Sequence, residues 1–192
     1  MPRRTDTRER VLRTAATLFQ TQGYHATGLN QVLAEGGAPK GSLYFHFPGG
    51  KEQLASEALT LAGAEMCLLI KTALDAAEKP EAAVDTVLAH LADALTASDF
   101  TAGCPVATVA LDTAGSSDTI RSACDEVYRS WTDTIAAYLV AHGADADRAA
   151  TLAVVLLASI EGALLLARTR RDVAPLLAVG AHLRPTLAEA LR

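Results

Sequence analysis

The chain has 192 residues and a mass of 20.1 kDa, and 50% of its residues are hydrophobic, which allows a packed core and excludes an intrinsically disordered protein. The formal net charge of −5 excludes a protein that coats nucleic acid with its whole surface. Residues 1–53 nevertheless contain seven Lys or Arg and four Asp or Glu, a balance of +3, which leaves −8 for residues 54–192. A positively charged N-terminal part therefore precedes an acidic body.

The cysteine pattern and the lack of long apolar runs indicate a soluble protein of a reducing cytosol. The three cysteines are widely spaced and form no C-x-x-C pair: Cys67, Cys104 and Cys124. This spacing does not fit a disulfide framework or a zinc ribbon. No apolar run follows Arg3 and Arg4, so no secretory signal is expected. The most apolar stretch, 152–167, has 16 residues, whereas a membrane span needs about 20, so we expect no membrane partner.

Strong helix formers dominate the whole chain, and no stretch alternates apolar and polar residues for long. Gly and Pro interrupt the sequence at intervals that predict an all-α fold. The predicted helices are 6–22, 28–35, 39–45, 51–78, 81–98, 104–113, 118–142, 146–168 and 173–190. Gly23 and Gly143 suit the left-handed position that ends a helix, and Asp147 is a candidate N-cap.

Two short segments after the first helix have the pattern of a helix-turn-helix. The segment from Leu29 has an i, i+3, i+4 apolar stripe, a Gly-Gly pair allows a sharp turn, and Pro39 is expected to open a second short helix. This arrangement places a recognition helix in the major groove of DNA. We expect residues 1–53 to form a three-helix helix-turn-helix domain and residues 54–192 a C-terminal helical domain.

Four separate segments carry a specific signature: Leu18–Tyr24, Ala26-Thr27, Pro39–Phe47 and Lys51–Leu54. Together they resemble the DNA-binding domain of the TetR family of bacterial transcriptional regulators. In many members one residue separates the proline after the aromatic run from the lysine, whereas this sequence has Gly49-Gly50. This form, together with the later segment Gly103–Ala107, is similar to the LmrA-like branch of the family.

The residues themselves predict how such a recognition helix meets DNA. Leu43 and Phe47, four residues apart, anchor its inward face. The outward face then holds Lys40, Ser42 and Tyr44. Gly41 has no side chain and lets the start of the helix approach the floor of the major groove. A lysine such as Lys40, at the opening of the helix, is suited to guanine O6 and N7.

The resemblance also implies a set of phosphate contacts. These fall on Thr27, Tyr44, His46 and Lys51. Hydroxyls and cations donate to phosphate oxygens, and such contacts set the register of a protein on DNA rather than its sequence preference. The alternative is that Tyr44 and His46 are ordinary, partly buried residues of a small helical domain.

For the C-terminal part, the resemblance implies a domain for ligand binding and dimerisation. The segment 152–167 is apolar nearly all round its predicted helix, so we expect it to be buried on more than one side. Leucines repeat at helical spacing in the last predicted helix, although Pro185 is expected to kink or restart it. Two such helices per subunit can pack against their copies as a four-helix interface, where Gly162 and Ala163 permit close approach. The alternative is that both helices form the core of a monomer.

Scarce aromatic residues and an isolated carboxylate suggest where a ligand binds. The candidate ligand-binding residues are Met66, Phe100, Cys104, Tyr128, Trp131 and Glu161. An apolar pocket between helices is the usual small-molecule site of a helical bundle. Glu161, within an apolar helix, can face a ligand amine, pair with an arginine or reach the helix edge. For each residue, a role in the structural core is the alternative.

No catalytic or cofactor-binding pattern is found. The sequence lacks G-x-S-x-G, G-x-G-x-x-G and H-E-x-x-H, its five histidines have no metal-ligand spacing, and Gly50-Lys51 lacks the rest of a phosphate-binding loop. We expect no enzyme activity, cofactor or metal. The predicted function is that of a cytoplasmic repressor, a homodimer that a small apolar or amphipathic ligand releases from palindromic operator DNA.

Two other functions remain open from the sequence. The three cysteines suggest a redox or protein-partner sensor that uses the same DNA-binding domain without a small ligand. An enzyme with a vestigial DNA-binding motif is the other alternative, although no acid, base or nucleophile arrangement supports it.

Overall fold

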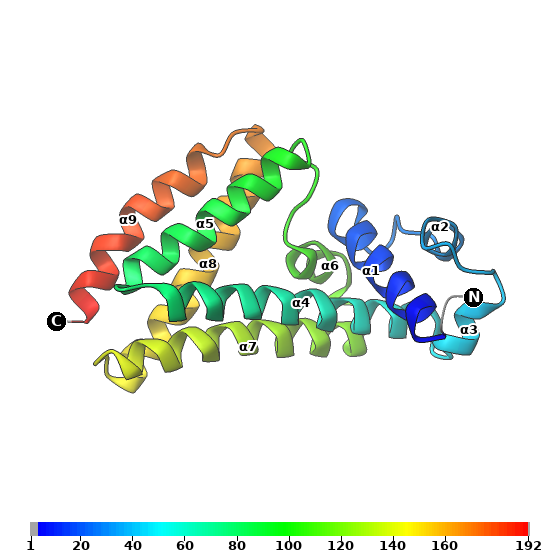
Figure 1. Cartoon of the computed structure of the whole chain (residues 1–192), viewed down its shortest axis with the longest axis horizontal. Coiled ribbons are helices and arrows are strands. Elements are labelled where there is room, and N and C mark those ends of the chain that lie inside the picture. Colours follow the sequence, from blue (N-terminus) through cyan, green and yellow to red (C-terminus); the bar gives the residue numbers. More distant parts are fainter. Residues whose placement is uncertain (1–3, 192) are drawn as a thin grey trace. The chain divides into compact units, whose positions relative to one another are not determined.

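The computed structural model of the chain describes residues 4–191 and confirms an all-α fold, with 80% of the chain in helices. Figure 1 shows the helices in chain order: α1 (Arg4–Gln22), α2 (Leu29–Glu35), α3 (Ser42–His46), α4 (Gly50–Ala76), α5 (Pro80–Ala97), α6 (Pro105–Thr113), α7 (Asp118–Ala141), α8 (Ala146–Arg170) and α9 (Ala174–Ala190). Each predicted boundary lies within three residues of the observed one.

The chain divides into two compact units. The first contains the residues up to Glu65 together with Cys104–Val127, and the second contains Met66–Gly103 and the residues from Tyr128 onward. Helices α4 and α7 each contribute residues to both units. The domain boundary after residue 53 stays a prediction.

In the first unit, α1 packs against α2 and α6. Its buried residues recur at i, i+1, i+4, i+7 and i+8, the spacing of one helix face: Val11, Leu12, Ala15, Leu18 and Phe19. Further along, α4 and α7 approach closely at Gly63, where an added Cβ would lie 2.4 Å from a methyl group of Val127. Only a glycine fits this crossing without moving the stiff β-branched side chain opposite it.

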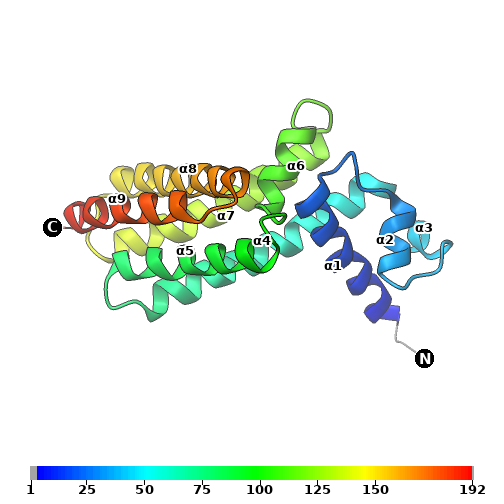
Figure 2. The same cartoon turned by 90° about the horizontal axis from the view of Figure 1, so that it is seen from above.

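In the second unit, α9 packs against both α5 and α8, and Figure 2 shows these three helices together. Leu176, Leu183 and Leu187 of α9 are buried. Gly180 lets α9 approach α5, because an added Cβ would lie 2.6 Å from Leu88. Pro185 lies inside α9 and does not end it.

One face of α8 is exposed, so the prediction that residues 152–167 are buried on more than one side is wrong for the single chain. The exposed positions recur at three- and four-residue spacing: Thr151, Val154, Val155, Ala158, Gly162, Leu165 and Leu166. By length and composition, α8 and α4 are apolar enough to cross a membrane. A periodic apolar stripe on one face is, however, the pattern of a helix that packs against another protein surface.

One helix end differs from the prediction and two agree with it. The N-cap of α8 is Asp145, whose carboxylate accepts hydrogen bonds from the backbone N–H groups of Asp147 and Arg148. Asp147 is therefore not the cap, because it already lies in the first turn. Gly23 and Gly143 have positive φ angles of 82° and 101°, as predicted for residues that end a helix.

Candidate nucleic-acid interface

The segment between α2 and α3 forms a turn that sets the start of the recognition helix. The carbonyl of Pro39 accepts hydrogen bonds from the backbone N–H (2.9 Å) and the hydroxyl (2.7 Å) of Ser42. Helix α3 therefore begins at Ser42, three residues later than predicted. Lys40 and Gly41 lie in the preceding turn, and the expectation that Lys40 opens the helix is wrong by these two positions.

Helix α3 has one buried and one exposed face. Leu43 is 3% exposed and Phe47 is fully buried, which confirms both as inward anchors. Tyr44 and Phe45 are 67% and 62% exposed. Phe45 was missing from the predicted contacts, although two anchors four residues apart already place positions 44 and 45 on the outer face. The helix thus presents two adjacent aromatic side chains to solvent.

The predicted phosphate contacts have different surroundings. Thr27 is 1% exposed, and its hydroxyl donates a 2.7 Å hydrogen bond to the carbonyl of Gly23. His46 is half-buried between the rings of Phe45 and Phe47, with centroid separations of 5.0 and 6.3 Å. In this conformation the hydroxyl proton of Thr27 is used in a hydrogen bond within the domain and is not available to a phosphate oxygen.

Lys51 lies in the first turn of α4, and its ammonium nitrogen is 4.4 Å from the centroid of the Tyr24 ring. This cation–π contact holds the side chain beside the α1–α2 turn. Partial burial lowers the pKa of Lys51. The ammonium has three N–H donors, so a nitrogen held over one ring face can still donate to a phosphate oxygen on its open side.

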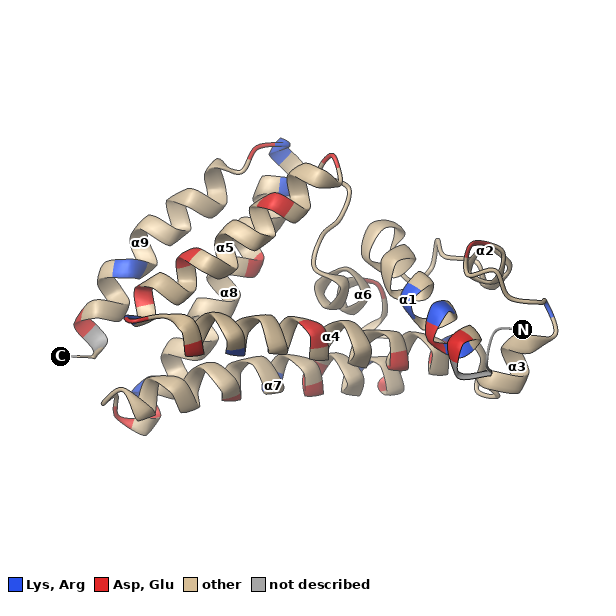
Figure 3. Ribbon diagram, viewed as in Figure 1, with Lys and Arg blue, Asp and Glu red and all other residues tan. Residues whose placement is uncertain are grey.

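Ion pairing decides which cations of the first unit are available to DNA. Three arginines of α1 pair with carboxylates: Arg8–Glu57, Arg10–Asp6, Arg13–Glu9 and Arg13–Glu65. In Figure 3 the Lys and Arg colouring of α1 accordingly lies beside Asp and Glu. Lys40 and Lys51 form no ion pair among residues 4–191. Among the described side chains of residues 6–53, Lys40 and Lys51 are therefore the cations without an ion pair.

A contact that the sequence did not reveal joins α6 to the α1–α2 turn. The backbone N–H of Tyr24 donates a 2.9 Å hydrogen bond to the carboxylate of Asp112, and Nε2 of His25 lies 3.1 Å from the Asp112 carbonyl oxygen. Gly23 leaves room for this carboxylate, since an added Cβ would lie 2.5 Å from Oδ2. The hydroxyl of Ser117 also donates to the carboxylate of Glu52, beside Lys51. Helix α6 thus contacts the α1–α2 turn, and the α6–α7 connection contacts the first turn of α4.

The predicted ligand-binding residues fall mostly in the second unit. Trp131 is 2% exposed, and its ring meets that of Tyr128 edge-on, with centroids 5.6 Å apart. Three further candidates of this unit are half-buried: Met66, Phe100 and Glu161. Cys104 is buried in the first unit, where its sulfur caps α6 by accepting from the N–H of Ala107 at 3.5 Å.

Helix α3 is short and is held by buried anchors. Its exposed aromatic side chains and the neighbouring lysines are typical of the recognition element of a helix-turn-helix protein that binds DNA. Comparisons with known proteins define the family. Residues 11–58 match the family "Bacterial regulatory proteins, tetR family", and residues 80–182 match "Transcriptional regulator LmrA/YxaF-like, C-terminal domain". The chain belongs to the TetR family of transcriptional regulators and to its LmrA/YxaF-like group.

Relatives and solved structures agree with this assignment. The chain is 41% identical to the HTH-type transcriptional regulator YxaF of Bacillus subtilis, over 93% of this chain and 94% of YxaF. It is 40% identical to the HTH-type transcriptional regulator LmrA of the same organism, over 90% and 92%. A TetR transcriptional regulator from Chloroflexus aurantiacus with a known crystal structure is 32% identical to this chain in sequence. The two structures superimpose with a TM-score of 0.76 over 96% of this chain and 95% of that one.

A more distant structure shares the fold. Regulatory protein TetR from Rhodobacter sphaeroides superimposes with a TM-score of 0.82 at 21% identity, covering 93% of this chain and 97% of that one. Because the family consists of soluble regulators, α4 and α8 are apolar helices of a soluble fold and not membrane spans.

The α6 contact yields a prediction. Asp112→Ala removes the acceptor of the Tyr24 N–H, so we expect faster amide hydrogen exchange at Tyr24 and a loss of about 0.5–1.5 kcal/mol in the free energy of unfolding. Exchange is measured by NMR and stability by urea denaturation. Asp118→Ala is the control, because this exposed carboxylate pairs only with Arg121 on the same helix among residues 4–191. Unchanged exchange at Tyr24 in Asp112→Ala would contradict the contact.

Proposed function

We propose that this chain is a cytoplasmic repressor that binds palindromic operator DNA as a homodimer and is released by a small apolar or amphipathic ligand. The observation that carries the proposal is the exposed face of α3 with Tyr44 and Phe45, preceded in the chain by Lys40, which is exposed and forms no ion pair among residues 4–191. Exposed aromatic groups next to a cation suit a groove lined by bases and phosphates.

The proposed contacts divide by position. The turn and the start of α3 face base edges with Lys40, Gly41 and Ser42. Tyr44, His46 and Lys51 contact phosphates, and Thr27 is kept in this set on the family resemblance alone. Lys40 is exposed in the turn before α3, so its ammonium group is accessible to a base edge. Phe45 adds an apolar surface suited to a thymine methyl group.

Substitutions of the two lysines are expected to weaken DNA binding in different ways. Lys40→Ala removes a base contact, so it lowers affinity for the operator alone, by about 1–3 kcal/mol. Lys51→Ala removes a phosphate contact, so it weakens binding to all DNA and lowers the salt slope by about one per lysine, or about two per dimer. Affinities for a duplex selected by the unmodified protein from a random pool, and for an unselected duplex, are measured across a salt series.

Each outcome of that experiment has a clear meaning. If Lys40→Ala weakens binding to both duplexes equally, Lys40 does not read bases. If neither variant changes binding, the helix-turn-helix is not the DNA-binding surface, and the proposed function fails.

The exposed apolar stripe of α8 supports the homodimer. Val154, Leu165 and Leu166 are 58%, 56% and 48% exposed, and Gly162 between them has open space in front of its Cα atom. Leu177 of α9 is also 63% exposed. A second copy of the chain, related to the first by a two-fold axis, covers this surface. A palindromic operator requires a protein with the same two-fold symmetry. Small residues at the centre of the stripe allow the copies to approach closely.

Leu165→Glu tests the interface, because it places a carboxylate in the proposed apolar contact. We expect the dimer dissociation constant to rise about 100-fold or more, measured by analytical ultracentrifugation. Leu111→Glu is the matched control, because Leu111 is 80% exposed on α6, outside the stripe, and should leave the dimer unchanged. Equal behaviour of the two variants would exclude the α8 face as the interface.

Ligand response is proposed to run through the second unit, where the edge-on pair of Tyr128 and Trp131 offers an aromatic wall. A ligand that displaces α6 also displaces the α1–α2 turn, because Asp112 holds Tyr24. Redox control by Cys124 is disfavoured, since burial raises the pKa of its thiol to about 11 and the reactive species is the thiolate.

Reciprocity gives the test of ligand release. If a ligand lowers operator affinity by a given factor, operator DNA must lower ligand affinity by the same factor, typically 5- to 150-fold. A compound that raises the melting temperature in a screen is titrated with and without the selected duplex. Equal ligand affinities in the two titrations would exclude release by that compound.

A further inference from the structure

The Gly49-Gly50 turn, where this chain departs from many TetR-family members, has its own set of contacts. Gly50 has a positive φ of 67°, which a glycine adopts without strain, and its N–H donates a 2.9 Å hydrogen bond to the carbonyl of Phe47. The turn therefore joins the inner anchor of α3 directly to the first turn of α4, where Lys51 lies.

A row of polar side chains continues from this turn to α1. The backbone N–H of Gly49 donates to Oε1 of Gln53 at 2.8 Å, and Nε2 of Gln53 donates to Oε1 of Glu57 at 2.9 Å. Oε2 of Glu57 in turn accepts a hydrogen bond from the guanidinium of Arg8. The amide of Gln53 thus uses its acceptor toward the turn and its donor toward the acid, so reversing it would break both contacts.

Arg8 connects this row of side chains to the end of α3. Its guanidinium carbon lies 5.0 Å from the centroid of the Phe47 ring, within the range of a cation–π contact. Phe47 is fully buried and ends α3 as its C-cap. The same row of side chains therefore fixes both sides of the turn, at Phe47 and at Gly49.

The row fits this turn closely. A Cβ added at Gly49 would lie 3.0 Å from Cβ and 3.1 Å from Oε1 of Gln53. A larger residue at position 49 would displace the Gln53 amide that holds the Gly49 N–H. The two glycines and Gln53 thus form one unit, in which the extra residue of the turn is accommodated by a specific partner.

We infer that Arg8, Glu57 and Gln53 are positioning residues for DNA binding, which hold the Gly49-Gly50 turn and so place Lys51 at the phosphate backbone. This inference rests on the proposed function, in which Lys51 contacts a phosphate. None of the three contacts DNA in this role; they act through the turn. Charge-assisted hydrogen bonds between partly buried groups are geometrically specific, which suits them to fixing a loop.

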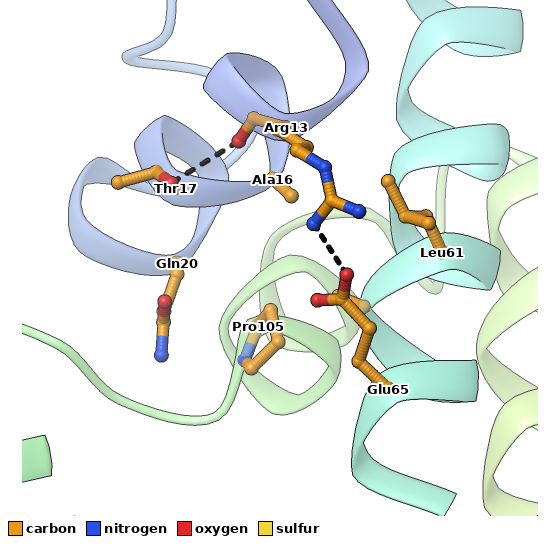
Figure 4. A pocket seen from close by; sticks show the side chains of 8 residues that line it. Arg13, Ala16, Thr17, Gln20, Leu61, Glu65 and Pro105 are labelled. Carbon is orange, nitrogen blue, oxygen red and sulfur yellow. Dashed lines mark hydrogen bonds and ion pairs between the residues drawn. The ribbon is translucent and has the colours of Figure 1, made fainter. Parts of the chain in front are cut away.

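The chain offers a matched control in a second ion pair between the same two helices. Nη1 of Arg13 in α1 lies 2.5 Å from Oε1 of Glu65 in α4. Figure 4 shows this pair beside a cavity of about 150 Å³ that is also lined by Gln20, Leu61 and Pro105. Glu57→Ala and Glu65→Ala each remove one negative charge and one α1–α4 ion pair, but only Glu57 is linked to the turn.

The test is a double-mutant cycle on the duplex that the unmodified protein selects from a random pool. We expect Gln53→Ala to weaken binding about three- to tenfold in the unmodified background. In the Lys51→Ala background its effect should fall below about twofold, because the side chain it positions is gone. Glu57→Ala should weaken binding to a similar extent as Gln53→Ala, and Glu65→Ala should not. Thermal melting of each variant confirms that it is folded.

Three results would overturn the inference: unchanged binding by Gln53→Ala, equal effects of Glu57→Ala and Glu65→Ala, or effects of Gln53→Ala and Lys51→Ala that multiply fully. These are distinguishable from a failure of the proposed function. In that case the unmodified protein selects no duplex at all, which removes the DNA-binding role and the positioning role together.

Discussion

Helix α3 has only five residues, and a helix of that length does not persist in water on its own. Its conformation depends on the burial of Leu43 and Phe47 against the rest of the helix-turn-helix. Fully burying two such side chains contributes about 3–6 kcal/mol, which offsets the cost of ordering so few residues. Because this anchoring uses only the inner face, the side chains of Tyr44 and Phe45 stay exposed on the outer face.

Ion pairs in the first unit determine which described cations remain available at its surface. Exposed ion pairs stabilise a protein little, so the arginines of α1 are better understood by what they remove from the surface than by what they add to stability. With Arg8, Arg10 and Arg13 paired, Lys40 and Lys51, which flank α3 in sequence, form no ion pair among the described residues. Proteins gain specificity when cations stand only where the DNA contacts are wanted, since scattered cations also favour non-specific binding.

The sequence predicted the helices closely, because hydrophobic periodicity and glycine or proline breaks are local properties. It also predicted the inner anchors of α3 from their four-residue spacing. Two details that depend on competing local hydrogen bonds were not predicted. Hydrogen bonds to the Pro39 carbonyl make α3 begin at Ser42 and not at Pro39. The N-cap of α8 is Asp145 and not Asp147. Contacts between distant residues were out of reach, as with Asp112 and Tyr24, which lie 88 positions apart.

The exposed stripe of α8 shows why periodicity alone could not decide between a core helix and an interface helix. An apolar residue at every three or four positions satisfies either packing, and only the arrangement of α5 and α9 reveals which face is left uncovered. If a second copy covers it, stability of the body and dimerisation become one equilibrium that depends on protein concentration. Operator binding then draws on the same equilibrium, because DNA with two half-sites favours the dimer. A change on α8 can then weaken DNA binding without altering any residue of the helix-turn-helix.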